Sequence, residues 1–100
     1  MNLVFKALSH PVRRRIVAML RQRPMSSGDI AGAFEMAWPT VTGHLNALKD
    51  AGLVDADRIG TSVCYRLNIG AAEEAVAFLM DLVGTGDEAI ATAPQSAEPA

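Results

Sequence analysis

The segment 38–50 places side chains that can hydrogen-bond to DNA on the outer side of a predicted helix. Val41, Leu45 and Leu48 follow one another at helical spacing and mark the face that this helix would bury. The N-terminal part of such a helix reaches the base edges when it enters a major groove, and threonine can hydrogen-bond to any base or contact the thymine methyl group. The candidate DNA-contacting residues of this segment are Trp38, Pro39, Thr40, Thr42, Gly43, His44, Asn46 and Lys49.

Phosphate contacts are expected from basic side chains and from one helix start. Lys49 and Arg58 suit this role because their positive charges complement the DNA backbone, and Arg58 lies at the base of a predicted wing. Ser26 begins another predicted helix, whose first backbone amides could face a phosphate. Arg58 and Ser26 therefore complete the candidate DNA-binding set.

Several of these side chains have a structural alternative. Thr40 and Thr42 could be ordinary surface residues, and His44 falls beside the apolar face, where it could be a packed, hydrogen-bonded histidine. Trp38 could cover the preceding turn instead of contacting a sugar-phosphate. The run Arg13–Arg15 cannot face DNA as a whole, since successive helical residues point about 100° apart.

The elements that would position these residues are two helices joined by a short turn and followed directly by a hairpin, which is the pattern of a winged helix-turn-helix. Ser26 with Asp29 resembles a capping box, and Gly52 fits the left-handed residue that follows a helix. We expect a mainly α fold with a two-stranded β-hairpin, in the order ααααββα. The expected helices are 3–8, 11–21, 26–35, 38–50 and 71–83, and the expected strands are 53–54 and 63–67, with the hairpin tip at 57–62.

Length and composition fit one domain at 1–83 followed by a tail. The chain has 100 residues, of which 50% are hydrophobic and 20% are charged, close to the globular norm of about 45–50% and about 25%. Residues 84–100 are rich in small and polar types and are predicted to be disordered. No apolar run approaches the roughly 18–20 residues that span a bilayer, and no signal peptide is visible, so we expect a cytoplasmic protein with no membrane partner.

The net charge of −2 divides unevenly along the chain. Residues 1–70 hold all nine basic side chains and five acidic ones, a balance of +4, whereas residues 71–100 hold six acidic side chains and no basic one. This asymmetry predicts one part that meets phosphate and another that is kept away from it. The balance is modest for a DNA-binding domain, so a winged-helix module that binds another protein is an alternative.

Two separated motifs resemble the ArsR family of bacterial repressors. Residues 5–13, with Ile16 and Leu20, are similar to that family's opening "ALxxPxRxxIL" stretch, and residues 42–54 are similar to its "S-x-HLxxLxxAGLV" signature. The resemblance covers residues 3–82 and implies a homodimeric transcriptional repressor that reads a palindromic operator in double-stranded DNA through the helix 38–50 and the wing 54–67. It also implies dimer contacts between the first and last helices, through Leu3, Val4, Phe5, Leu8, Val76, Leu79, Met80 and Val83.

The chain lacks the metal ligands of that family's metal sensors. Their "CxC" motif is replaced by the segment 27–31, and the last predicted helix contains no histidine. His10, His44 and Cys64 are too few and too scattered for zinc, so we expect no metal and no cofactor. The single cysteine also excludes an internal disulfide.

An enzyme is not expected, because no paired nucleophile and base can be placed. The effector remains open: an unidentified protein partner, a small molecule that binds between the dimer helices near Phe5, Phe78 and Met80, or no inducer at all.

Overall fold

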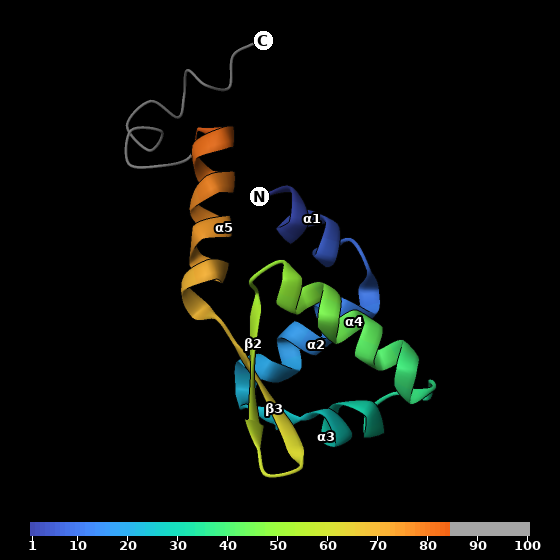
Figure 1. The fold of residues 1–100 in the computed structure, drawn as a ribbon. Helices are drawn as coiled ribbons and strands as arrows, with labels where there is room; N and C mark the ends of the chain where they lie inside the picture. The colour runs from blue at the N-terminus through green and yellow to red at the C-terminus, as the bar shows by residue number, and fades with distance from the viewer. Residues whose placement is uncertain (85–100) are drawn as a thin grey trace.

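The computed structural model describes residues 1–84, which form five helices and a small antiparallel sheet. The hairpin of this sheet lies at one edge of the molecule, with α2, α3 and α4 to one side of it and α5 extending from its base (Figure 1). Most of the predicted tail, from residue 85 onward, lies outside the described residues. The mainly helical winged helix-turn-helix architecture agrees with the prediction. The elements are α1 (Asn2–Leu8), α2 (Pro11–Gln22), β1 (Met25–Ser26), α3 (Ser27–Gly32), α4 (Trp38–Asp50), β2 (Val54–Ile59), β3 (Ser62–Leu67) and α5 (Ile69–Val83).

The sheet has one strand more than the sequence predicted. Its order is β1-β3-β2, and both pairs are antiparallel, with Ser26 opposite Cys64 and Arg58 opposite Val63. The predicted tip at 57–62 was too long, since β2 extends to Ile59 and β3 resumes at Ser62. The two-residue turn between them uses Gly60 at φ 64°, a left-handed value that suits glycine.

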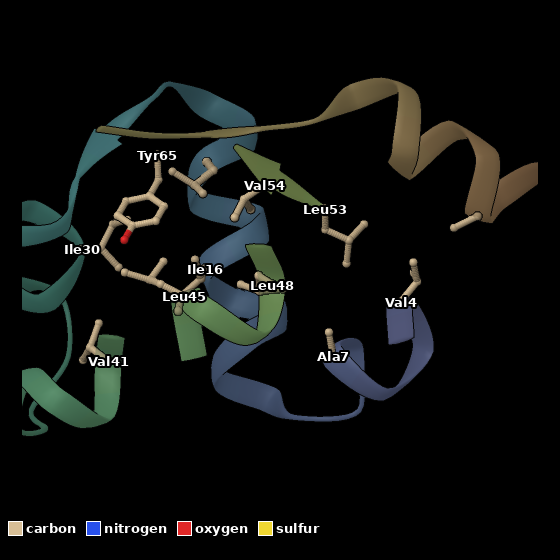
Figure 2. Close-up of a cluster of buried hydrophobic side chains, with 12 residues drawn as sticks. Val4, Ala7, Ile16, Ile30, Val41, Leu45, Leu48, Leu53, Val54 and Tyr65 are labelled. Carbon is tan, nitrogen blue, oxygen red and sulfur yellow. The ribbon is translucent and has the colours of Figure 1, made fainter. Parts of the chain in front are cut away.

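The core lies between the helices and the sheet and buries one side of α4 (Figure 2). Residues from α2, α3, α4 and β2 have almost no exposed surface, and Tyr65 of β3 packs with them. Val4 and Ala7 bring α1 into the same cluster. The fully buried large side chains are Ile16, Ile30, Val41, Leu45, Leu48, Leu53 and Val54.

Local signals explain where the helices of the helix-turn-helix begin and end. The Ser26 hydroxyl accepts a hydrogen bond from the Asp29 amide at 3.1 Å, which confirms the predicted cap of α3. α3 ends at Gly32, three residues before its predicted end. α4 ends in a Schellman arrangement: Gly52, at φ 81°, donates to the Lys49 carbonyl, and Leu53 donates to the Leu48 carbonyl.

Two glycines of this region give opposite predictions for the same substitution. Gly43 lies inside α4 with open space where a Cβ would sit, so Gly43→Ala should raise the free energy of unfolding by up to about 1 kcal/mol. Gly52→Ala should lower it by about 1–2 kcal/mol, because alanine is strained at positive φ. Urea unfolding at one protein concentration checks both, and a destabilised Gly43→Ala would contradict the open helical site.

Candidate nucleic-acid interface

One side of α4 is exposed along its whole length, while the other is built into the core. The exposed residues include Pro39, Thr40, Gly43, Asn46 and Lys49, and Thr42 is half-buried on the flank. The helix begins at Trp38 after Ala37, with Pro39 in its first turn, where a missing amide costs nothing. The polar candidates therefore lie on a continuous outer surface, which we call the α4 outer face.

Trp38 bridges the two helices of the helix-turn-helix. Its indole lies 3.4 Å from the position that a Cβ on Gly28 of α3 would take, yet 54% of the residue is exposed. The side chain thus covers the junction of α3 with α4 and still presents a ring edge to solvent. This position is compatible with both sequence-based hypotheses for Trp38, which are covering the preceding turn and contacting a sugar-phosphate.

His44 lies inside the molecule, unlike the other candidates of α4. Only 9% of it is exposed, its Nδ1 accepts a hydrogen bond from Arg13 Nε at 3.1 Å, and its ring contacts that of His10 at a centroid distance of 4.4 Å. Burial, and then the neighbouring His10 and Arg13, hold the pKa of His44 below its ordinary value of 6.5. The geometry corresponds to the packed alternative, so His44 is not part of the α4 outer face.

The wing carries two exposed arginines of different character. Arg66 forms ion pairs with Asp55 and Asp57, which lie on the same side of the hairpin. Arg58 forms no ion pair within residues 1–84 and is exposed near the hairpin tip. The sequence prediction placed Arg58 in the wing but at its base, whereas the residue lies near the tip, one position before the end of β2. The prediction also missed that Arg66 is neutralised by its neighbours.

Ser26 has a structural task in the single chain. Besides capping α3 it pairs with Cys64 in the sheet, and it is half-buried. Its hydroxyl is therefore already engaged at the helix start that the sequence suggested for a phosphate.

A second surface, made of apolar side chains, covers α5 and the start of α1. Val76, Leu79 and Val83 are between 45% and 65% exposed, and Leu3 is 60% exposed. Val4, predicted to lie in a dimer contact, is buried in the core of the single chain, because α1 packs inward at this residue. We call the exposed apolar surface of α5 the α5 apolar face. It also contains Ile69, Phe78 and Leu82, which the predicted set omitted.

Residues 1–84 contain no group of three or more His, Cys, Asp or Glu side chains that could hold a metal ion. Among the same residues, no helix has the length and apolar character needed to cross a membrane.

Acidification should destabilise the fold through His44. Its lowered pKa means that the unfolded chain takes up the proton more readily, so the stabilisation is present above pH 6.5 and is lost as the pH falls through the folded-state pKa. Urea unfolding at about pH 7.5 and about pH 5 should show that the free energy of unfolding falls less in His44→Asn than in the wild type. Asparagine keeps an acceptor for Arg13 but does not titrate. An equal loss in both proteins would assign the pH dependence to other groups.

Sequence comparison relates the chain to known repressors. The model of the arsR family of bacterial regulatory proteins matches residues 10–56. The chain is 37% identical over 87 residues to the transcriptional repressor SdpR of Bacillus subtilis, covering 87% of this chain and 97% of that protein. It is 32% identical over 79 residues to the biofilm growth-associated repressor of Agrobacterium fabrum, covering 79% of this chain and 64% of that protein.

Solved structures share the same fold. An ArsR-like transcriptional regulator from Rhodococcus sp. RHA1 superposes with a TM-score of 0.76 at 27% identity, covering 99% of this chain and 93% of that one. The homodimeric winged helix-turn-helix DNA-binding domain of a possible ArsR-family regulator from Mycobacterium bovis gives a TM-score of 0.64 at 38% identity, over 88% and 78% of the chains. The sequence match and the shared architecture show that the chain belongs to the ArsR family of bacterial regulatory proteins, which are DNA-binding transcriptional regulators and not enzymes.

Proposed function

We propose that the chain is a homodimeric repressor that reads a palindromic operator through α4 and the wing and that needs no metal. The observation that carries this proposal is the α4 outer face, whose polar residues are exposed because the opposite side of the helix is buried. An exposed, rigidly held helix of this kind fits a major groove.

The N-terminal half of α4 is the part best suited to reading bases. Thr40 is exposed and can hydrogen-bond to any base, Thr42 flanks it, and Gly43 lets the helix backbone approach the groove floor closely. Asn46 supplies an amide suited to adenine. Asp50 places a negative charge at the C-terminal end of the same face, where it repels phosphate. This charge favours entry of the first turns of α4 into the groove.

Phosphate contacts flank this surface. Arg58 is exposed on the wing without an ion pair in the described residues, so its charge is available to the backbone. Lys49 is exposed near the end of α4 and takes the same role, and Trp38 with Pro39 supplies apolar contact to a sugar. Ser26 would contribute only its backbone, since its hydroxyl caps α3.

The α5 apolar face supports pairing with a second copy. Seven large apolar residues of α5 are at least 41% exposed, which is unusual for a monomer surface. The Mycobacterium bovis relative is described as homodimeric. In Figure 1, α1 and α5 lie at the opposite end of the molecule from α3 and the hairpin tip, so pairing through α5 leaves the α4 outer face free. A twofold pair presents two such helices, which suits a palindrome.

Metal independence is supported by how the histidines are used. His44 accepts from Arg13 and packs on His10, and Cys64 lies in β3 opposite Asp57 and Ser26. At the ligand position suggested near Phe5, Phe78 and Met80, the two phenylalanine rings contact each other directly and fill part of the space. Their ring centroids are 5.8 Å apart.

Operator binding should depend on the open surface at Gly43. Wild-type protein should bind a labelled duplex from the region upstream of its own gene more tightly than a random duplex in fluorescence anisotropy. Gly43→Glu should abolish this binding while circular dichroism stays unchanged, because the added side chain enters open space that DNA would fill. Ala18→Glu, at an exposed position of α2, is the matched control and should still bind. Equal affinity for both duplexes would refute the operator assignment.

The wing contact should be visible in the salt dependence. Each phosphate contact contributes about −0.9 to the slope of log K against log salt, so Arg58→Gln should make the slope shallower by about that amount per subunit. Lys6→Gln, on α1, should leave the slope unchanged. A wild-type slope in Arg58→Gln would remove the wing arginine from the interface.

Dimerisation should depend on α5. Val76→Glu places a charge in the α5 apolar face, where Val76 is 56% exposed, and should convert the dimer to monomers in analytical ultracentrifugation. Ile59→Glu is the control, because Ile59 is also exposed, at 65%, but lies on the wing. If Val76→Glu sediments like the wild-type dimer, the copies pair through another surface.

A further inference from the structure

A pocket of about 240 Å³ lies where α1 and α2 meet the C-terminal part of α4. Because liquid water occupies about 30 Å³ per molecule, this space corresponds to about eight waters and suits a small organic molecule. Its lining residues are Leu3, Lys6, Ala7, Arg13, Ala47 and Asp50.

The charges of the pocket favour an anion. Lys6 and Arg13 bring two positive charges against the single carboxylate of Asp50, and within residues 1–84 neither cation forms an ion pair shorter than 4.0 Å. Arg13 is half-buried and uses its Nε for His44, which leaves its terminal N–H groups for an acceptor. A partly buried guanidinium without a counter-charge gains from a carboxylate that can pair with it.

The remaining walls favour an apolar body. Leu3, Ala7 and Ala47 contribute aliphatic surface, and Leu3 is 60% exposed at the rim. We propose that this pocket binds a small organic carboxylate, with its charged head at Lys6 and Arg13 and its apolar body against the alanines.

Arg13 connects this pocket to the proposed DNA-reading helix. Its Nε donates to Nδ1 of His44, which lies on the buried side of α4. A carboxylate that pairs with the Arg13 guanidinium therefore contacts the side chain that is hydrogen-bonded to the buried side of α4. The regulatory meaning of the site rests on the proposed function, whereas ligand binding itself does not.

Benzoate, which joins one carboxylate to an apolar ring, is the probe, and neutral benzamide is its matched control. In ¹H–¹⁵N NMR titrations of the full chain, benzoate should shift the amides of Ala7, Arg13 and Ala47 saturably, and benzamide should not. Absence of saturable shifts, or equal shifts with benzamide, would overturn the anion site.

Substitutions at the rim give a signed test that leaves the Arg13–His44 hydrogen bond in place. Lys6→Gln should weaken benzoate binding at least tenfold, whereas Asp50→Asn should tighten it, because a like charge is removed. Arg21→Gln, at an exposed position of α2, should bind as the wild type does. Unchanged affinity in both Lys6→Gln and Asp50→Asn would show that the ligand binds elsewhere.

The link to α4 has its own readout. Bound benzoate should raise the pKa of His44 measured from its imidazole protons, because the carboxylate offsets the charge of Arg13 that lowers this pKa. An unmoved pKa with benzoate bound would disprove the link. Benzoate binding in a chain without operator preference would overturn only the proposed function, and operator preference without benzoate binding would overturn only the pocket.

Discussion

The burial of one side of α4 is the constraint on which the rest of the structure depends. Val41, Leu45 and Leu48 have at most 1% of their surface exposed, and they contribute to a core shared with α2, α3 and the sheet. Because a helix repeats every 3.6 residues, fixing these three side chains inward turns Thr40 and Gly43 outward. The surface proposed to meet DNA is therefore a geometric consequence of the core, and it needs no separate loop to hold it.

Polar contacts inside the fold fix the rotation of α4 more narrowly than apolar packing alone. Apolar side chains tolerate exchange of neighbours, whereas His44 has its Nδ1 paired with Arg13 in a buried setting. Turning α4 by one residue, about 100°, would separate this pair and leave a buried acceptor unsatisfied. The Schellman end at Gly52 then sets the direction in which the chain leaves α4 for the wing.

Features that depend on local sequence could be predicted, and features that depend on distant partners could not. The Ser26 cap, the Gly52 terminus and the apolar spacing of α4 are written in neighbouring residues, and all three are confirmed. β1 could not be found, because two residues are too short to show alternation and pair only with β3. The burial of His44 depends on Arg13, 31 residues away, so the sequence could only offer it as an alternative.

The fold also determines where the acidic and basic side chains lie relative to the proposed DNA-binding surface. Asp55 and Asp57 lie in the wing close to the proposed interface, but Arg66 pairs with both, so their repulsion of phosphate is offset and Arg58 keeps its full effect. α5 carries Glu73, Glu74 and Asp81 but no basic residue, and it lies at the far end of the molecule from the hairpin tip. A weakly charged chain can thus still offer basic side chains to duplex DNA, because two acidic residues of the wing are paired with Arg66 and three more lie on the helix proposed for dimerisation.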